Sequence, residues 1–519
     1  MSGLKGRDIT DTERITQLGL APSDDHNQTL VHNVNPPAWT NPEPSGRYHV
    51  VVIGAGTAGL ISAAFAAGAG ARVALVERHL MGGDCLNVGC VPSKSLIRSS
   101  RVFSELRNAA VLGWHIPEGA KVDFAQVMRR MRAVRAQISA HDSAWRYRDQ
   151  KGIDVYLGSA CFTGSDTLKV AGKTLHFKKA VIATGARAAI PPIEGLADAG
   201  FLTNATIFNL TACPKRLAVI GGGPIGTELA QAFNRLGAEV TLFEAGPQLL
   251  GKEDPEAAAI IQNVMRDEGV QLVLGCQLQR IETTDTGKVL HYQVDGSVDK
   301  ISVDAIFVGT GRTPNVEGLG LEAAGVRYTQ DGIITTDDLR TTNAKIYTAG
   351  DVALPWKFTH AAEEAARMAV QNALFPGRRT LGTLTMPWCT YTDPEIAHVG
   401  IHEDEARKQG VEVDTFVHRW SDVDRAITDG DDEGFVKIYA KKGTDQILGG
   451  TIVARHAGEM ISELTLAIVG KIGLKKLASV IHPYPTQADA IRRAAFAYNM
   501  TRVTPFAKKL LGLWLRFTG

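Results

Sequence analysis

Two stretches of the chain repeat one pattern of apolar and polar positions. Each begins with a short apolar run, passes through a glycine-rich turn into a longer segment of small and apolar residues, and ends in a second apolar run. Short apolar runs bounded by glycine are typical of buried parallel strands, and the longer segment is typical of a helix. The pattern therefore predicts strand, helix and strand twice: residues 49–53, up to about 70, and 72–76; then 217–220, 227–236 and 239–243.

Both turns have the spacing Gly-x-Gly-x-x-Gly, with an acidic residue 23 positions after the first glycine. Such a turn brings backbone N–H groups and a helix N-terminus against a pyrophosphate, and the acid accepts hydrogen bonds from a ribose. One glycine turn alone is weak evidence, but the complete order occurring twice predicts two dinucleotide-binding units. Their residues are Gly54, Gly56, Gly59 and Glu77 in the first unit and Gly221, Gly223, Gly226 and Glu244 in the second.

The remaining chain contains a helical region and a mixed region. Residues 93–150 have apolar positions at helical spacing, which we interpret as core contacts: Val127, Met131, Val134 and Ile138. The region from 387 to about 500 alternates in character, and it predicts strands at 435–439 and 447–453 and a helix at 460–469.

Composition excludes several classes of protein. The 519 residues are too many for one core and indicate about three domains. Lys and Arg number 56 against 55 Asp and Glu, so no bulk positive field is available to gather nucleic acid. Six cysteines fit a reducing compartment, and neither a signal peptide nor a run of about 18 apolar residues is evident. A cytoplasmic protein is the default expectation.

The two ends of the chain differ from the rest. Residues 1–46 end in a proline-rich stretch that cannot form the interior of a helix or central strand, and we interpret them as an added arm. Residues 502–519 are apolar with flanking cations and too short to span a bilayer. They predict an amphipathic helix, for which docking on its own protein is favoured over contact with a membrane surface.

Two cysteines with four residues between them lie in the segment GGDCLNVGCVPSK, residues 82–94. A zinc site needs four ligands, and no second pair or histidines at ligand spacing complete one here, so we predict no metal site. The segment resembles the redox-active segment of the class I pyridine nucleotide-disulfide oxidoreductases, the flavoprotein family of dihydrolipoyl dehydrogenase, glutathione reductase and mercuric reductase. The resemblance covers roughly residues 47–500.

The resemblance implies that the first dinucleotide unit holds the ADP half of FAD. Two further segments support FAD: Thr184 and Gly185 close a predicted strand, and Asp351 matches the aspartate that binds the ribityl chain of the flavin. Asp351 could instead cap the helix that follows. Gly311, which comes after a predicted strand at 301–308, is also assigned to the cofactor-binding residues.

By the same resemblance, Cys85 and Cys90 form the redox disulfide. Cys90 takes the position against the flavin, and Cys85 exchanges with the substrate. Lys94 matches the lysine beside the hydride-accepting nitrogen of the flavin, and Glu228 matches its ion-pair partner. A helix N-terminus and a nearby cation both lower a cysteine pKa and so favour the reactive thiolate.

The second dinucleotide unit is expected to hold NAD(P)H. Glu244 would repel the 2′-phosphate of NADPH and suits a free 2′-hydroxyl, and residues 245–248 contribute no arginine. The sequence therefore favours NADH, although mercuric reductases, which are otherwise similar, generally use NADPH.

The family pattern breaks near the C-terminus. Disulfide reductases of the family carry a histidine and a glutamate there, which protonate the departing thiolate in the site of the partner subunit. Tyr484 occupies the histidine position and Asp489 the glutamate position. A tyrosine with a pKa near 10 is a poor proton shuttle at neutral pH, whereas an imidazole near 6.5 is well matched. His482, two residues upstream, either restores the acid–base group or is a packing or surface histidine.

We therefore predict an α/β protein with two Rossmann-like nucleotide-binding domains and an α+β C-terminal dimerisation domain. The expected function is an FAD-dependent NAD(P)H oxidoreductase and homodimer that reduces a thiophilic acceptor such as a metal ion. Alternatives are a small or protein disulfide, a quinone, or a role as a redox sensor. The predicted boundaries are 1–46 for the extension, 47–186 and 316–384 for the FAD domain, 187–315 for the NAD(P) domain, 385–501 for the interface domain and 502–519 for the tail.

Overall fold

The computed structural model describes residues 10–285 and 287–518. The chain forms two compact units, the first from residues 1–245 and 275–384 and the second from residues 246–274 and 385–519. The mixed α/β class predicted from the sequence is confirmed. The finer domain boundaries stay a prediction.

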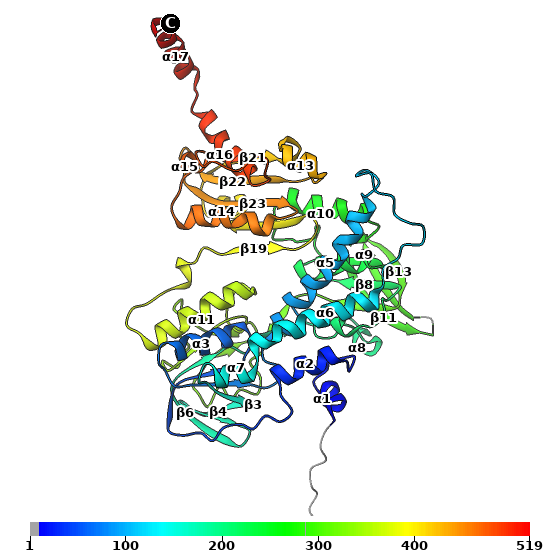
Figure 1. Cartoon of the computed structure of the whole chain (residues 1–519), viewed down its shortest axis with the longest axis vertical. Helices are drawn as coiled ribbons and strands as arrows, with labels where there is room; N and C mark the ends of the chain where they lie inside the picture. The colour runs from blue at the N-terminus through cyan, green and yellow to red at the C-terminus, as the bar shows by residue number, and fades with distance from the viewer. Residues whose placement is uncertain (1–9, 286, 519) are drawn as a thin grey trace, which may run out of the picture. The chain divides into compact units, whose positions relative to one another are not determined.

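A seven-stranded sheet lies in the first unit, in the order β3-β2-β1-β6-β5-β4 with β18 paired to β6. Its central strands pair in parallel, and β2 is buried at every position, which is typical of a strand covered on both faces. Helices α3 (Thr57–Gly68) and α11 (Thr359–Leu374) pack side by side against it (Figure 1). The strands are β1 (Arg47–Ile53), β2 (Val73–Glu77), β3 (Asp154–Leu157), β4 (Ala160–Gly164), β5 (Thr167–Val170), β6 (Lys173–Ile182) and β18 (Ile346–Thr348).

A second parallel arrangement in this unit joins β9, β8 and β14. It contains the second predicted strand, helix and strand, as β8 (Arg216–Ile220), α9 (Pro224–Arg235) and β9 (Glu239–Glu244), with β14 (Ala305–Val308) on the other side of β8. The remaining elements are α4 (Gly83–Asn87), α5 (Cys90–Arg107), α6 (Phe124–Ser139), α7 (Ala144–Asp149), α8 (Leu196–Ala199), β7 (Ala186–Ala188), β11 (Gln277–Thr284), β12 (Gly287–Val294), β13 (Ser297–Val303), β15 (Arg312–Pro314), β16 (Tyr328–Thr329) and β17 (Gly332–Ile333).

The N-terminal arm contains two helices that the sequence analysis did not place, α1 (Asp11–Gln17) and α2 (Asp25–Val34). The Asp24 side chain caps α2 by accepting the Asn27 N–H at 3.0 Å, and Leu30 and Val34 are buried. Helix α2 lies along α6 (Figure 1). The proline-rich stretch after it has neither helix nor strand, as predicted.

The position of α2 changes which face of α6 is buried. Of the four predicted core positions, only Met131 is fully buried. Val127, Val134 and Ile138 are half-buried, so the prediction overstated their burial. Arg132 and Arg135 are buried instead: the first donates to Asp24 Oδ2 at 2.6 Å and the second to Asn27 Oδ1 at 2.7 Å. Charged groups can be buried here because α2 supplies their partners.

The second unit is built on an antiparallel five-stranded sheet, in the order β19-β20-β23-β22-β21. Helices α14 and α16 share one apolar core with it, and the predicted strands and helix of this region are present. The elements are α10 (Pro255–Asp267), β10 (Gln271–Leu274), β19 (Pro387–Thr390), β20 (Glu395–Gly400), α12 (Glu403–Lys408), β21 (Val413–Arg419), α13 (Asp424–Asp429), β22 (Phe435–Lys441), β23 (Ile447–Ala454), α14 (Ala457–Val469), α15 (Leu474–Leu477), α16 (Asp489–Thr501) and α17 (Pro505–Thr518).

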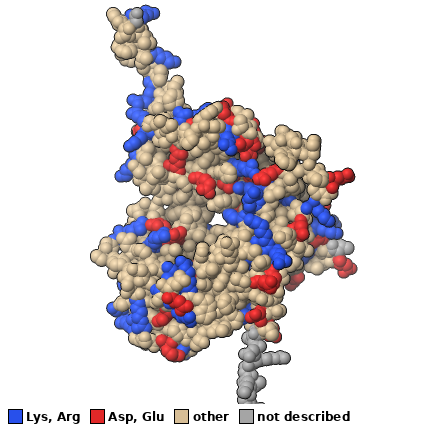
Figure 2. Space-filling model, in the orientation of Figure 1, with Lys and Arg blue, Asp and Glu red and all other residues tan. Residues whose placement is uncertain are grey.

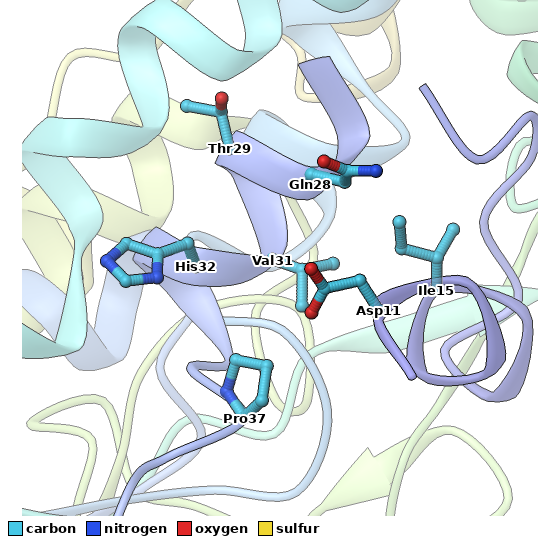
Figure 3. A pocket seen from close by; sticks show the side chains of 7 residues that line it. All are labelled: Asp11, Ile15, Gln28, Thr29, Val31, His32 and Pro37. Atoms are coloured by element: carbon cyan, nitrogen blue, oxygen red, sulfur yellow. The ribbon is translucent and has the colours of Figure 1, made fainter. Parts of the chain in front are cut away.

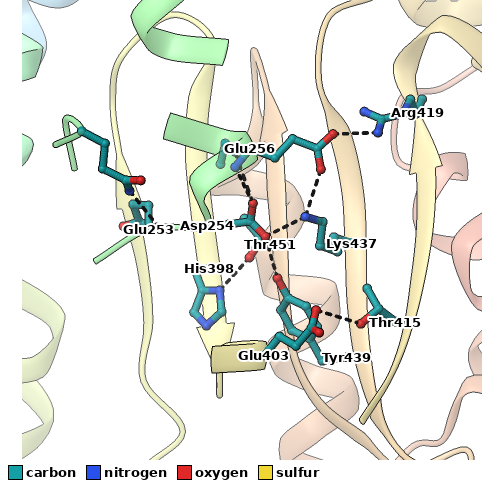
Figure 4. A network of polar contacts seen from close by, with 12 residues as sticks. Glu253, Asp254, Glu256, His398, Glu403, Thr415, Arg419, Lys437, Tyr439 and Thr451 are labelled. Carbon is teal, nitrogen blue, oxygen red and sulfur yellow. Dashed lines mark hydrogen bonds and ion pairs between the residues drawn. The ribbon is translucent and has the colours of Figure 1, made fainter. Parts of the chain in front are cut away.

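A polar network attaches the start of α10 to this sheet (Figure 4). The Lys437 ammonium on β22 donates to Asp254 Oδ2 at 2.7 Å and to Glu256 Oε2 at 3.1 Å. The neighbouring Glu253 accepts the Trp388 indole N–H at 2.7 Å on one oxygen. Its other oxygen is buried without a hydrogen-bond partner among the described residues, and burial raises the pKa of Glu253 to about 7.

We expect this carboxyl to make stability depend on pH. A carboxyl whose pKa is higher in the folded than in the unfolded protein stabilises the fold while protonated, and that contribution is lost as pH rises from about 4.5 through about 7. Between pH 5 and pH 8, the free energy of unfolding should fall by about 2–3 kcal/mol more in the unaltered protein than in Glu253→Gln. Urea unfolding at both pH values measures this. Glu256→Gln is the matched control, because the pKa of the Glu256 carboxyl is lowered in the unaltered protein. If the free energy of unfolding fell as much in Glu253→Gln as in the unaltered protein, the prediction would be contradicted.

The C-terminal helix α17 does not dock on its own chain, so the favoured prediction for the tail is wrong. None of its residues is buried, and the exposed fraction of Phe506 is 73%. Among the described residues, no helix is long and apolar enough to cross a membrane.

Candidate active site

The first glycine turn connects β1 to α3. A Cβ atom on Gly54, whose φ is +97°, would lie 2.4 Å from the Ala183 carbonyl oxygen, and one on Gly59 would lie 1.8 Å from the Gly54 oxygen. Neither position accepts a larger residue without moving backbone, because real Cβ atoms do not approach so closely. The turn thereby holds α3 close to the end of β6.

Glu77 at the end of β2 faces this turn. Its carboxylate accepts the Ala55 N–H and the His79 N–H, both at 2.7 Å. Burial raises the pKa of Glu77, and these two hydrogen bonds oppose the shift. The acid is therefore fixed beside the turn by the backbone itself, and its role in binding a ribose stays a prediction.

The redox segment begins against the same turn. A Cβ atom on Gly83 would lie 2.5 Å from Gly56 Cα, and the Gly82 N–H donates to the Ala55 oxygen at 2.8 Å. Both glycines have positive φ. The paired glycines therefore bring α4 against the first dinucleotide turn, which explains why they precede the cysteines.

Cys85 lies in α4 and Cys90 is the first residue of α5. The Cys85 thiol donates a hydrogen bond to the Cys90 sulfur, and the Thr359 hydroxyl lies 3.3 Å from the same sulfur. The Cys85 bond lowers the pKa of Cys90 to about 6, with further help from Thr359 and from the positive charge of Lys94, while it raises the pKa of Cys85. The pair is thus asymmetric, with the thiolate on Cys90.

Lys94 lies one helical turn after Cys90 on α5. Its ammonium donates to Glu228 Oε2 on α9 at 2.7 Å, and Glu228 is buried. The structure therefore brings together Cys85, Cys90, Lys94 and Glu228, as the resemblance implies. Thr359 was missed, because nothing in the local sequence marks a threonine that begins a helix 269 residues away.

Arg312 connects the redox segment to Asp351 and was also missed as a site residue. Its guanidinium donates to the Asp84 carboxylate, and its Nε lies 3.2 Å from Asp351 Oδ2. Burial raises the pKa of Asp351, and the charge of Arg312 opposes the shift. Three further predicted positions lie on adjoining loops: Thr184 donates to the Asn315 oxygen at 2.7 Å, and Gly185 and Gly311 have open space where a Cβ would stand.

The second glycine turn repeats the geometry of the first. A Cβ atom on Gly226 would lie 1.9 Å from the Gly221 oxygen, whereas one on Gly223 would meet nothing within 4 Å. Glu244 Oε2 accepts the Gly222 N–H at 2.6 Å. The two turns are therefore equivalent structures, each with an acid bonded to the backbone of its turn.

The predicted C-terminal acid–base residues form three separate contacts within the second unit. The Tyr484 hydroxyl donates to Asp424 Oδ2 at 2.9 Å, and this bond raises the pKa of the phenol. Asp489 accepts from two arginines, each at 2.7 Å, and although burial acts against it these bonds lower the pKa of Asp489. His482 Nε2 lies 3.0 Å from Glu463 Oε1, so a His–carboxylate pair exists, with a glutamate that the sequence analysis did not consider.

A pocket of about 280 Å³ lies in the first unit (Figure 3). It is lined by residues of the N-terminal arm: Asp11, Ile15, Gln28, Thr29, Val31, His32 and Pro37. None of the predicted site residues lines it.

Comparison with known proteins agrees with this geometry. The family model described as pyridine nucleotide-disulphide oxidoreductase matches residues 48–373, and the dimerisation domain of the same family matches residues 386–495. The chain belongs to this family. Its members use FAD and NAD(P)H, and the dimerisation domain supports a homodimer.

Several members of the oxidoreductase family are similar over most of their length. A mercuric reductase from Staphylococcus aureus is 33% identical over 94% of this chain and 88% of its own, and a dihydrolipoyl dehydrogenase from Chlamydia muridarum is 32% identical over 86% and 96%. Among solved structures, the HOCl-induced flavoprotein disulfide reductase RclA from Escherichia coli has a TM-score of 0.77 at 28% identity, covering 86% of this chain and 99% of its own. RclA is also known as a Cu(II) complex.

The residues of this oxidoreductase fit its family cofactor. No side chain caps the N-terminus of α3, so its first N–H groups face the glycine turn and suit a pyrophosphate. Glu77 keeps acceptor capacity for a ribose hydroxyl beside the two N–H groups that hold it. Gly54, Gly56, Gly59, Glu77 and Asp351 would hold FAD.

We expect Glu244 to set the nicotinamide preference. The unaltered enzyme should have the higher kcat/KM with NADH, and Glu244→Arg should shift the ratio towards NADPH by about 10- to 100-fold, because a charged hydrogen bond contributes about 1.5–3 kcal/mol. Steady-state kinetics with both nucleotides measure the ratio. Glu244→Gln, which keeps an acceptor for the Gly222 N–H and removes the charge, is the control. Equal or better kinetics with NADPH in the unaltered enzyme would refute the assignment.

Proposed function

We propose that this enzyme transfers electrons from NAD(P)H to a thiophilic metal ion through the Cys85–Cys90 pair. When bound, FAD supplies the two-electron link between the nicotinamide and the cysteines. Hg(II) is the first choice, because the similar mercuric reductases are named for it, and Cu(II) is a second example of the same class.

The cysteine pair suits such an acceptor. A thiolate is the form that binds a soft metal ion, and the lowered pKa of Cys90 favours that form at neutral pH. Cys85 gives up its proton when it binds the ion, which removes the hydrogen bond that raised its pKa. Two thiolates then hold the ion between α4 and the start of α5.

The observation that carries the proposal is the state of Tyr484. Reduction of Hg(II) to Hg(0) takes two electrons and no proton, whereas reduction of a disulfide takes two electrons and two protons. At the position where disulfide reductases of the family have their proton-donating histidine, this chain has a phenol of raised pKa bonded to Asp424. Asp489 is held by Arg492 and Arg493 and does not orient it. The position therefore supports an acceptor that needs no proton.

A disulfide acceptor is the second candidate, and one observation favours it. His482 and Glu463 form an imidazole–carboxylate pair, which is the chemical unit that a disulfide reductase needs. The His482 side chain is mostly buried, as the side chain of a histidine with only a packing role would also be.

An acceptor panel separates the two candidates. The purified enzyme loaded with FAD would be assayed with Hg(II), Cu(II), glutathione disulfide, lipoamide and a quinone, each with NADH and with NADPH. The proposal expects the highest kcat/KM with a metal ion. A disulfide as the best acceptor, together with loss of that activity in His482→Gln, would establish the second candidate instead.

A further inference from the structure

The C-terminal helix α17 separates apolar from cationic side chains along its length. Large apolar residues cover more than half of the helix circumference: Phe506, Leu510, Leu511, Leu513, Trp514, Leu515 and Phe517. The opposite side carries Lys508, Gly512 and Arg516, spaced four apart, with Lys509 beside them. Helix α17 contains no acidic residue, and Figure 2 shows only cationic and uncharged residues on its visible face.

This apolar face is exposed. The exposed fractions are 59% for Leu510, 63% for Trp514 and 84% for Phe517, and none of the helix is buried. Soluble proteins rarely leave a contiguous apolar patch of this kind uncovered, so it marks a surface that binds something.

We propose that α17 binds the surface of an anionic lipid membrane and lies in the plane of the headgroups. Its 14 residues span about 21 Å, less than the roughly 30 Å of the hydrocarbon core, so the helix rests on the bilayer. The apolar face enters the boundary between headgroups and acyl chains, where an indole such as that of Trp514 is favoured. The three cations contact anionic headgroups on the other side.

Charge distinguishes a membrane from a second copy of the chain. Two α17 helices that packed apolar face to apolar face would leave their cations on the outside of the pair, and neither helix has a carboxylate to pair with them. An anionic lipid surface supplies the missing negative charge. The whole chain has 56 cationic and 55 acidic side chains, whereas α17 has cationic side chains and no acidic ones.

Vesicle flotation with the full chain, loaded with FAD, tests the proposal. The protein should float with vesicles of phosphatidylcholine and phosphatidylglycerol, and less with phosphatidylcholine alone. Replacing Lys508, Lys509 and Arg516 by glutamine should lower the partition coefficient by about 100-fold, since each cation near the surface contributes about a factor of five. Replacing the exposed Lys471, Lys475 and Lys476 by glutamine makes the same change in net charge and should have little effect.

Two further measurements show where the helix lies and what else covers it. Brominated lipids should quench Trp514 fluorescence, and Trp514→Phe should abolish that quenching while the protein still floats. A chain ending at Thr504 should lose flotation and keep its sedimentation coefficient, apart from the lost mass. Unchanged flotation of the shortened chain would overturn the proposal. So would dissociation of the shortened chain to a smaller species, with no flotation of the full chain, because the apolar face would then contact a second copy.

Discussion

Replacing either Cys85 or Cys90 with serine should lower kcat/KM for the acceptor by at least about 1,000-fold, because each supplies one of the two sulfurs that carry the electrons. The two variants should nevertheless differ. Cys90 has the lowered pKa, and its largest cause is the hydrogen bond from Cys85. The Cys85→Ser variant keeps a hydroxyl donor at that position, whereas Cys85→Ala does not.

Alkylation of the reduced enzyme by iodoacetamide at a series of pH values measures this difference. The pH midpoint of Cys90 alkylation should lie near 6 in the unaltered enzyme. This midpoint should stay low in Cys85→Ser and should rise towards the ordinary thiol value of about 8.5 in Cys85→Ala. Thr359→Val removes a second hydrogen bond to Cys90 and should raise the midpoint by less. In the FAD-loaded enzyme, long-wavelength absorbance at neutral pH should appear in Cys85→Ser and not in Cys90→Ser.

Two results would contradict these assignments. If the low midpoint belonged to Cys85, the roles of the cysteines would be reversed. If either serine variant reduced the acceptor at the normal rate, the pair would not lie on the catalytic path.

Local sequence predicted the parts of the site that depend on backbone geometry. The first and third glycines of each turn and Gly83 are required by contacts under 3 Å, so their spacing carries the structure directly. Contacts between distant segments carry no such signal. Thr359 on α11 and Arg312 on β15 reach the site from more than 200 residues away, and the sequence alone does not reveal which threonine or arginine arrives.

The same limit explains the errors in the fold. Apolar periodicity in α6 predicts one buried face, but α2 covers another and supplies partners for Arg132 and Arg135. A polar residue becomes a core residue only when a second element satisfies it, and a single helix pattern does not contain that information. The tail shows the reverse case, since its apolar periodicity predicts a buried face and the structure leaves that face exposed.

The second large effect concerns Tyr484→His. A positioned acid typically contributes about 100- to 10,000-fold to a proton-dependent step, and a dialkyl disulfide releases a thiolate of pKa about 8.5 that must be protonated. We therefore expect turnover with glutathione disulfide or lipoamide to rise by at least about 100-fold. Turnover with Hg(II), which needs no proton, should stay constant or fall.

The structure changes which carboxylate would assist the new histidine. Asp489 is bonded to Arg492 and Arg493, whereas Asp424 already accepts the Tyr484 hydroxyl at 2.9 Å. Asp424 is thus the residue that would orient an imidazole at position 484. The gain should therefore be lost in the double variant with Asp424→Asn and kept in the one with Asp489→Asn, provided that both fold.

Two controls separate proton transfer from a change in shape. Tyr484→Phe removes the hydroxyl without adding an acid and should not increase disulfide turnover. The gain in Tyr484→His should follow the protonated fraction of an imidazole, so kcat should decline above about pH 6.5. Efficient disulfide reduction by the unaltered enzyme would contradict the prediction, because His482 with Glu463, or water, would then already supply the proton and Tyr484 would be no barrier.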